Sequence, residues 1–201
     1  MKLSIQHLLR NLENGHPDTL EQAKKALPSL IVQIDGLAAM ANEFAQFAKL
    51  PEPEFEPIDL KQLIINTLPL FENNSVIDLK CTGSKFQVLA DKKMLGQILN
   101  NLITNALQAT QTTLQPKIEI ALFSDAKEVT LEVKDNGIGI NDATKEKIFT
   151  PYFTTKSSGS GIGLNVVKQI LEKHNGHIHF HSEAGKGSCF VVALPLFSKR
   201  P

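Results

Sequence analysis

The sequence lacks an excess of charge of either sign. Its 201 residues include 21 Lys and Arg and 21 Asp and Glu, so the formal net charge is zero. Proteins that bind nucleic acids usually carry a basic surface, so we expect no nucleic-acid partner. Hydrophobic residues make up 42% and charged residues 21% of the chain, which indicates a globular protein rather than a disordered one.

Cysteine is scarce, and long apolar runs are missing. Cys81 and Cys189 each lie in a strand-like run, and two isolated thiols favour a reducing compartment. No apolar run is long enough to span a bilayer, and the sequence shows no signal-peptide pattern. We therefore expect no membrane segment in this chain. We expect a cytoplasmic location, which includes the cytosolic part of a membrane-anchored sensor.

The first fifty residues predict two helices joined by a turn. A turn signal at 14–18 separates a short apolar stripe from an apolar pattern that repeats every seven residues between 19 and 50. Pro28 should bend or interrupt the second helix, and the prolines and glutamates of 51–57 predict a stiff linker. The apolar positions are Leu3, Ile5, Leu8, Leu9 and Leu12 in the stripe, and Leu27, Leu30, Ile34, Leu37, Ala41, Phe44 and Ala48 in the repeat.

The rest of the chain mixes strands and helices without a regular alternation. We expect helices at 58–71, 92–110, 143–149 and 163–174, and strands at 76–81, 86–91, 118–123, 129–135, 177–182 and 189–196. This order favours an α+β fold in which a sheet is layered against helices. We place a helical hairpin at 1–54 and a second domain at 55–201.

The stretch VTLEVKDNGIGI contains the first candidate site. Val129, Leu131 and Val133 alternate with polar residues and should face the core, and Asp135 falls on the same inward parity. A buried carboxylate is costly unless it is hydrogen-bonded, so Asp135 is a candidate to bind a ligand donor such as an exocyclic amine. The following Gly137 lets the backbone come close to a ligand. The alternative is a hairpin turn, because Asn-Gly is a favoured turn dipeptide.

The helix at 92–110 carries an unusual polar line. Gln97, Asn101 and Asn105 are spaced by four residues and lie along one side of the helix. Their amide oxygens could bind Mg²⁺, which prefers oxygen ligands and shares itself with phosphates. The alternative is a solvated polar stripe. A third candidate is the glycine-rich stretch 159–163, which opens a helix and would present free N–H groups to a phosphate, although a mobile loop is the simpler interpretation.

Taken together, these stretches resemble a known family. The order NLxxNA, DNGIGI, FTPYFTTK and GSGIGL resembles the N, G1, F and G2 boxes of sensor histidine kinases, and GHIHFHSEAGKGSCFVVALP resembles the last strand pair of that family. The resemblance covers 57–197. It implies a two-layer α/β sandwich, with a mixed sheet covered on one face by helices. It also implies a protein-histidine kinase that binds ATP and Mg²⁺ beneath a mobile lid.

The resemblance also assigns roles to individual residues. Asp135 would accept a hydrogen bond from the adenine amine, Asn105 would hold Mg²⁺, and Asn101 would lie near the phosphates. The glycine-rich lid would wrap the phosphates. The full set of expected ATP-site residues is Asn101, Asn105, Gln108, Asp135, Gly137, Gly139, Ile140, Tyr152, Phe153, Thr155, Lys156, Gly159, Ser160, Gly161, Ile162, Gly163, Leu164 and Ser188.

Several positions depart from the family pattern. Ser160 and Ser188 replace threonines but keep a hydroxyl, and Gln108 replaces a basic residue, which leaves Lys156 as the better candidate for that charge. Asn101 stands where hydrolytic relatives of the gyrase, Hsp90 and MutL types carry a glutamate base. Without a carboxylate to activate water, we expect slow hydrolysis and favour phosphoryl transfer.

The phosphoacceptor histidine of the family is expected outside these residues. Its motif, HExxNPL, is absent from the 201 residues, and MKLSIQHLLR resembles the segment just after that motif in the NtrY-like nitrogen-regulation branch. We therefore expect a truncated dimerisation hairpin and a fragment that does not phosphorylate itself. His7 lacks an acidic neighbour and His16 lies in a turn, so we expect neither to accept phosphate.

The intact protein would form a homodimer through the hairpin and pass phosphate to the receiver domain of a response regulator. Two alternatives stay open, a nucleotide-binding scaffold without phosphotransfer and a serine kinase of the anti-sigma type. The heptad repeat at 19–50 argues against the second alternative. His177, His179 and His181 alternate along one strand, where a solvated face is favoured over a metal site.

Overall fold

The computed structural model describes residues 9–11, 13–14, 20–21, 23–32, 34, 50–71, 74–156 and 159–197. The chain divides into two compact units, Met1–Lys49 with Lys156–Ser160, and Leu50–Thr155 with Gly161–Pro201. In the smaller unit, residues 23–32 are helical, so Pro28 does not interrupt the helix, and the predicted alternative of a bend stays a prediction. His7, His16, Ala41 and most of the predicted repeat lie outside the described residues.

The larger unit is built on a five-stranded mixed sheet. Its strands are β2 (Ile77–Thr82), β4 (Ile118–Ser124), β5 (Glu128–Asp135), β6 (His177–Glu183) and β7 (Gly187–Pro195), and their order across the sheet is β2-β4-β5-β7-β6. β2 and β4 are parallel, and every other neighbouring pair is antiparallel. The predicted mixed sheet is confirmed.

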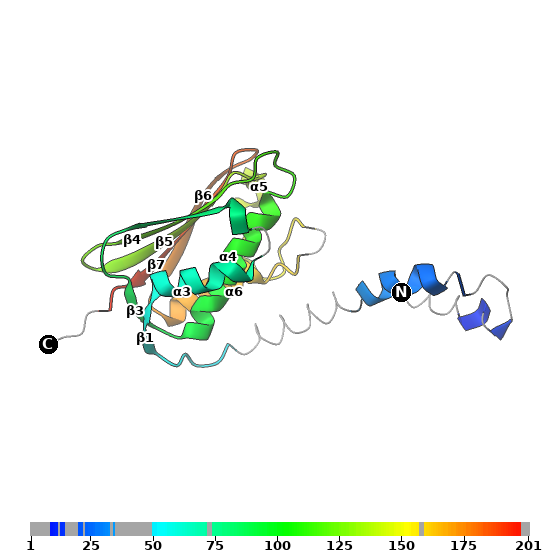
Figure 1. The fold of residues 1–201 in the computed structure, drawn as a ribbon, viewed down its shortest axis with the longest axis horizontal. Helices are drawn as coiled ribbons and strands as arrows, with labels where there is room; N and C mark the ends of the chain where they lie inside the picture. The colour runs from blue at the N-terminus through cyan, green and yellow to red at the C-terminus, as the bar shows by residue number, and fades with distance from the viewer. Residues whose placement is uncertain are drawn as a thin grey trace. The chain divides into compact units, whose positions relative to one another are not determined.

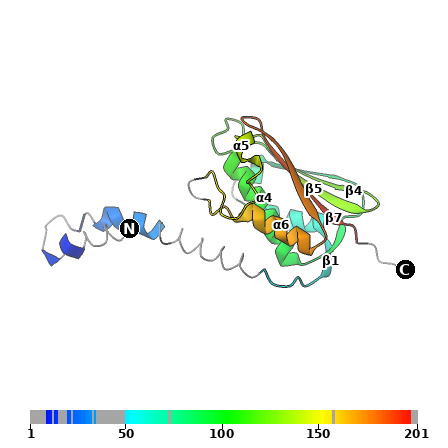
Figure 2. The ribbon, with the colours of Figure 1, turned by 180° about the vertical axis from the view of Figure 1, so that it is seen from behind.

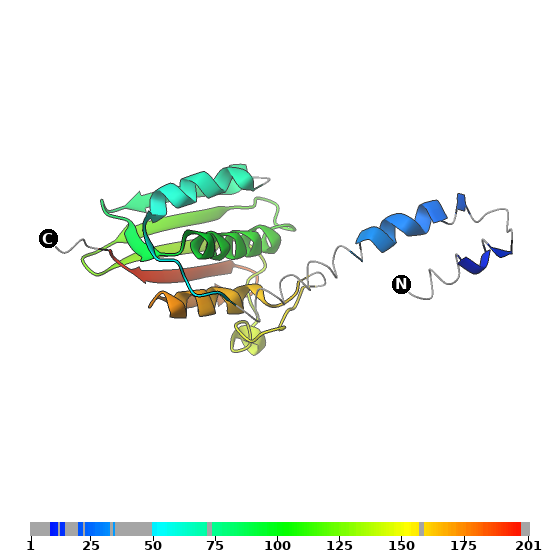
Figure 3. The same ribbon diagram turned by 90° about the horizontal axis from the view of Figure 1, so that it is seen from below.

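Three helices cover one face of this sheet. They are α3 (Leu60–Thr67), α4 (Lys92–Ala109) and α6 (Gly163–Lys173), and α4 lies between the other two (Figure 1, Figure 3). The view from behind shows the same layering of helices against strands (Figure 2). The α+β fold, a two-layer α/β sandwich with helices on one face, is therefore confirmed.

The core forms between the helices and the sheet because each element has one apolar side. Val129, Leu131 and Val133 of β5 are at most 2% exposed, as their alternation predicts. Leu102 and Ile103 of α4 are fully buried against them in the same core. Burying each such side chain contributes about 1.5–3 kcal/mol, so this interface holds the ends of β5 and α4 at fixed positions.

Two of the predicted helices differ from the observed elements. The helix expected at 58–71 begins at Leu60, because Ile58 and Asp59 belong to strand β1 (Glu56–Asp59), which pairs with β3 (Gln87–Ala90). Pro57 is tolerated in β1 because this strand has a partner on one side in the two-stranded ribbon. The helix expected at 143–149 is the short α5 (Asp142–Lys145), after which the chain turns.

A helix that crosses a bilayer must be both long and apolar along its length. Within the described parts of the chain, no helix meets both requirements.

Candidate functional site

Asp135 ends β5 as a buried carboxylate. Asp135 is 5% exposed, which confirms the prediction that it faces the core side of β5. Its Oδ1 atom accepts hydrogen bonds from the backbone N–H of Gly137, at 2.8 Å, and of Ser188, at 3.3 Å. These donors offset part of the cost of burying the carboxylate. They also fix its orientation between the loop that follows β5 and the start of β7.

The loop after Asp135 approaches two other parts of the backbone too closely for a side chain. A Cβ atom on Gly137 would lie 2.3 Å from the carbonyl oxygen of Ala109, at the end of α4. A Cβ atom on Gly139 would lie 2.0 Å from the carbonyl oxygen of Glu183, at the end of β6. Glycine is therefore required at both positions by backbone packing. The loop is wedged between α4 and the β6–β7 turn.

The hairpin interpretation of Asn136-Gly137 is wrong. β5 pairs with β4 and β7, and the chain after the loop continues to α5 rather than to a strand paired with β5. The Asn136 side chain accepts from Lys117 N–H at 2.8 Å and donates to the Gln115 carbonyl at 2.8 Å. Asn136 thus joins the loop to the segment before β4.

Backbone and hydroxyl contacts hold the remainder of the loop. Ile138 N–H donates to the Ala109 carbonyl at 3.1 Å, and the Ile138 carbonyl accepts from Gly185 N–H at 2.8 Å. Ile140 N–H donates to Ser182 Oγ at 2.8 Å. The sequence interpretation missed Ser182. The sequence pattern could have indicated this residue. Ser182 follows Ile178 and Phe180 on the half-buried side of β6, and it lies near the end of that strand, as Asp135 lies at the end of β5.

The polar line of α4 runs beside the start of α6. Gln97, Asn101 and Asn105 are half-buried, and Gln108 is exposed. A Cβ atom on Gly163, the first residue of α6, would lie 2.8 Å from Asn101 Oδ1. The asparagines therefore do not form a fully solvated stripe. Asn101 lies beside a helix N-terminus whose backbone N–H groups favour anions.

Two parts of the segment between α5 and α6 pack together. Tyr152 adopts a φ of 64°, and Gly161 a φ of 72°. A Cβ atom on Gly161 would lie 2.6 Å from the carbonyl carbon of Tyr152 and 2.7 Å from the backbone of Phe153. Asn165 of α6 donates to the Phe149 carbonyl at 2.8 Å, a positioning contact that the sequence interpretation missed. Ile162 is buried and Leu164 is half-buried, so the start of α6 is anchored in the core.

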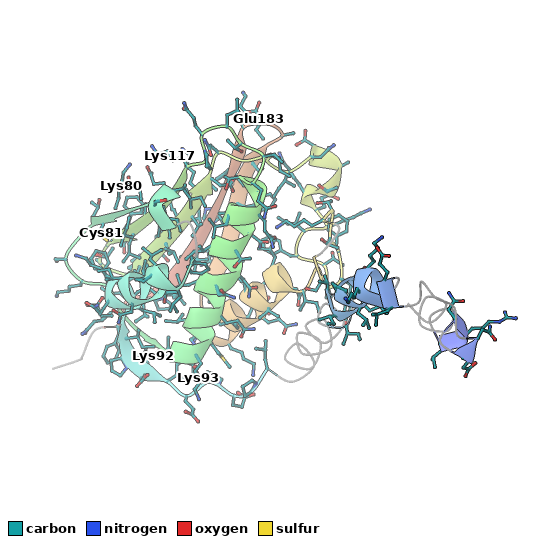
Figure 4. All side chains as sticks on the ribbon, turned by 45° about the vertical axis from the view of Figure 1, so that its right-hand side comes forward. Lys80, Cys81, Lys92, Lys93, Lys117 and Glu183 are labelled. Atoms are coloured by element: carbon teal, nitrogen blue, oxygen red, sulfur yellow. The ribbon has the colours of Figure 1, made fainter. Side chains whose placement is uncertain are left out.

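The structure brings together part of the predicted set. Asp135, Gly137, Gly139, Ile140 and Ser188 meet around one loop, and Asn101 meets Gly163. The loop after Asp135 lies against Glu183. Figure 4 shows that Glu183 is at one end of the larger unit and that Lys92 and Lys93, at the start of α4, are at the opposite end. Lys156, Gly159 and Ser160 fall in the other unit, and Thr155 is exposed, so their contribution to the site stays a prediction.

The three histidines of β6 lie on its exposed side. Neighbouring ring centroids are 6.3 Å and 5.7 Å apart, between His177 and His179 and between His179 and His181. Across the part of the chain that the structure describes, no group of three or more His, Cys, Asp or Glu side chains is arranged to hold a metal ion.

A family model now matches the region that carries this loop. Residues 90–198, more than half of the chain, match the family described as histidine kinase-, DNA gyrase B-, and HSP90-like ATPase. The chain belongs to this family. The match spans α4, the Asp135 loop, α6 and the β6–β7 pair, which are the elements that form the candidate site.

Two curated relatives are a sensor histidine kinase and a nitrogen regulation protein. The chain is 36% identical over 169 residues to the sensor histidine kinase ZraS of Escherichia coli K12, with 82% of this chain and 36% of the relative covered. It is 24% identical over 208 residues to the nitrogen regulation protein NtrY of Azorhizobium caulinodans, with 100% of this chain and 27% of the relative covered. The chain therefore spans about a third of the length of these relatives.

Solved structures of histidine kinase ThkA share the fold. The ThkA catalytic domain is 33% identical, has a TM-score of 0.63, and covers 71% of this chain and 96% of its own length. A second ThkA structure, in complex with the response regulator protein TrrA, is 27% identical with a TM-score of 0.73. That match covers 97% of this chain and 57% of the ThkA chain.

Proposed function

We propose that this chain is the ATP-binding catalytic part of a two-component sensor histidine kinase. In this proposal the γ-phosphoryl group of ATP passes to a histidine outside these 201 residues and then to an aspartate of a response regulator. The observation that carries the proposal is the buried Asp135 carboxylate, held by Gly137 and Ser188 N–H groups at the edge of a glycine loop. Family membership supports the same conclusion.

Asp135 is suited to recognise the adenine base. A carboxylate accepts hydrogen bonds and donates none when it is ionised, so it pairs with the exocyclic amine of adenine. If guanine took the place of adenine, its carbonyl oxygen would face the Asp135 carboxylate, and two acceptors cannot form a hydrogen bond with each other. Gly137 and Gly139 leave no side chain over the loop, so a flat base can approach its backbone. Asp135 would therefore both bind ATP and discriminate against GTP.

The phosphates are proposed to lie between α4 and α6. The N-terminus of α6 at Gly163 offers backbone N–H groups and the positive end of the helix dipole, and Asn101 lies directly against it. Lys156, Gly159, Ser160 and Gly161 belong to the proposed lid, in which Lys156 would supply the positive charge that Gln108 lacks. The lid would close over Tyr152, Phe153 and Lys156, and Gly161 packs against the backbone of Tyr152 and Phe153.

Asn105 is the proposed protein ligand for Mg²⁺. Asn105 is half-buried and lies one turn along α4 from Asn101, the residue beside Gly163. This fits the chemistry of Mg²⁺, which is bound in nucleotide sites by one or two protein oxygens together with phosphate oxygens and water. When bound, the ion would neutralise charge on the phosphates during transfer.

Phosphoryl transfer is favoured over hydrolysis. Direct hydrolysis needs a base that takes a proton from the attacking water, and the amide of Asn101 cannot act as one. The Asn101 amide oxygen points to the start of α6, where a Cβ atom on Gly163 would lie 2.8 Å from it, and this placement suits a positioning role. Hence we propose that the γ-phosphoryl group leaves ATP when an imidazole nitrogen attacks it.

The proposed partners are inferred from the relatives. ThkA was solved in complex with the response regulator TrrA, and this supports a receiver domain as the partner of the intact protein. Similarity to NtrY over the whole chain supports the nitrogen-regulation branch, and the heptad pattern at 19–50 supports a homodimer. We also propose a cytoplasmic location, because the reaction uses ATP and a cytoplasmic regulator.

Labelling with γ-labelled ATP and Mg²⁺ tests the proposal. This chain should take up no label, whereas a version extended at its N-terminus through the phosphoacceptor histidine should take up label that is acid-labile and alkali-stable. Label on this chain alone would mean that one of its six histidines accepts phosphate. If the extended protein binds ADP but takes up no label, the result supports the alternative function, a nucleotide-binding scaffold without phosphotransfer.

A further inference from the structure

The Ser182 hydroxyl lies where three segments of the candidate site meet. Its Oγ atom is 2.8 Å from Ile140 N, 2.9 Å from the Gly187 carbonyl oxygen, and 3.0 Å from Ser188 Oγ. Ile140 is 42 residues away along the chain and belongs to the loop after Asp135. Thus one side chain links this loop to both strands of the β6–β7 hairpin.

A hydroxyl group can satisfy all three contacts at once. It has one proton to donate and two lone pairs that accept. One assignment uses all of them: Ser182 donates to the Gly187 carbonyl, and accepts from Ile140 N–H and from the Ser188 hydroxyl. An alanine at this position would leave Ile140 N–H, which is part-buried, without this acceptor.

The network continues to the carboxylate that is proposed to read the base. Ser188, whose hydroxyl contacts Ser182, donates its backbone N–H to Asp135 Oδ1. Gly137, at the other end of the same loop, donates to the same oxygen. Asp135 therefore holds the beginning of the loop, and Ser182 holds its end at Ile140. Between them, Ile138 is held by backbone bonds to Ala109 and Gly185.

We propose that Ser182 is a positioning residue for nucleotide binding. Its hydroxyl fixes the end of the loop at Ile140 against Ser188, so that Asp135 and the loop backbone keep the spacing needed to bind adenine. This inference rests on the proposed ATP site. Ser182 acts through Ile140 and Ser188, and it contacts neither the base nor the phosphates in this account.

A set of variants on one strand tests the inference by calorimetric titration with ADP and GDP. Ser182→Ala should weaken ADP binding about three- to tenfold, the value of one part-buried hydrogen bond. It should also lower the preference for ADP over GDP, and it should speed amide exchange at Ile140. Ser182→Thr keeps the hydroxyl and should restore all three readouts. His179→Ala, on the exposed side of β6, is the matched control and should behave as the wild type.

Ser182→Cys covers the case in which Ser182→Ala does not fold. It keeps the size of the side chain but accepts hydrogen bonds weakly, so it should give an intermediate affinity for ADP. A folded Ser182→Ala or Ser182→Cys protein with wild-type affinity and wild-type base preference overturns the inference alone. A wild-type protein that does not bind ADP overturns the proposed function, and this inference with it.

Discussion

His174 accepts a hydrogen bond at Nε2 from the backbone N–H of Asp91, at 3.0 Å, across 83 residues of sequence. Its Nδ1 atom is 2.7 Å from the Ile170 carbonyl, so the ring proton lies on Nδ1 in the tautomer that satisfies both contacts. The residue is 3% exposed, and the Phe55 ring packs on it with centroids 5.1 Å apart. This relationship joins the end of α6 to the start of α4.

His174→Leu should therefore destabilise the larger unit. Leucine fills a similar volume but leaves the buried Asp91 N–H without its acceptor, which costs about 1–3 kcal/mol. Chemical denaturation followed by circular dichroism measures this difference. Glu172→Ala, an exposed neighbour on the same helix, is the control and should change stability by less than about 0.5 kcal/mol. Equal stability of the leucine variant and the wild type would contradict this role for His174.

Asp91 gives the fold a specific acid sensitivity. Burial raises the pKa of its carboxyl, but N–H groups of Glu54, Met94 and Lys93 donate to it and outweigh this, so the pKa lies below its ordinary value. A depressed pKa stabilises the fold above the pKa of the unfolded chain, near 3.8, and this contribution is lost as pH falls through the lower folded value.

Asp91→Asn should accordingly be less stable than the wild type at pH 7, by about 1 kcal/mol, because the N–H groups bond more strongly to a charged carboxylate than to a neutral amide. The difference in unfolding free energy between the two proteins should shrink as pH falls below about 4. Only the wild type has a carboxylate at position 91 that becomes protonated in this range. Unfolding curves from pH 7 to pH 2.5 measure this. A difference that stays constant or grows with acid would rule out the charged carboxylate as its source.

Gly139→Ala should abolish nucleotide binding. The added Cβ would lie 2.0 Å from the Glu183 carbonyl oxygen, and the φ of 65° is itself unfavourable for alanine. Gly185→Ala separates these two effects, because Gly185 has a φ of 78° but no atom within 4 Å of a built Cβ. We expect Gly185→Ala to lose only about 1–2 kcal/mol of stability and to bind ADP when folded. Similar ADP affinities for the two folded variants would contradict the wedged loop.

Sequence patterns predicted those features that depend on one segment alone. The alternation of β5 predicted that Asp135 faces inward, and the helix predicted at 92–110 is α4, Lys92–Ala109. Both result from the periodicity of a single element and from the burial of its apolar side. The residues alone indicated Asp135 and Asn105 as candidate ligand-binding groups, whereas their assignment to adenine and Mg²⁺ came from a family resemblance, and both roles stay proposals.

Features that depend on two distant segments were not predictable in this way. β1 forms only because Glu56–Asp59 meets Gln87–Ala90, and the prolines before it indicated a linker. The contact between Ser182 and Ile140 needs the β6–β7 hairpin to reach the loop after β5, and the His174–Asp91 bond needs two helix ends to meet. Each residue looks ordinary in its own segment.

The measurement that tests the central claim most directly is calorimetric titration of ADP into this chain and its Asp135→Asn variant. Asparagine keeps an oxygen that can accept from Gly137 and Ser188, so the fold should survive, but its amide N–H₂ opposes the adenine amine. The wild type should bind ADP, and the variant about 10- to 150-fold more weakly. Asp78→Asn, an exposed carboxylate on β2, should bind as the wild type does. A folded Asp135→Asn protein with wild-type ADP affinity would contradict the account.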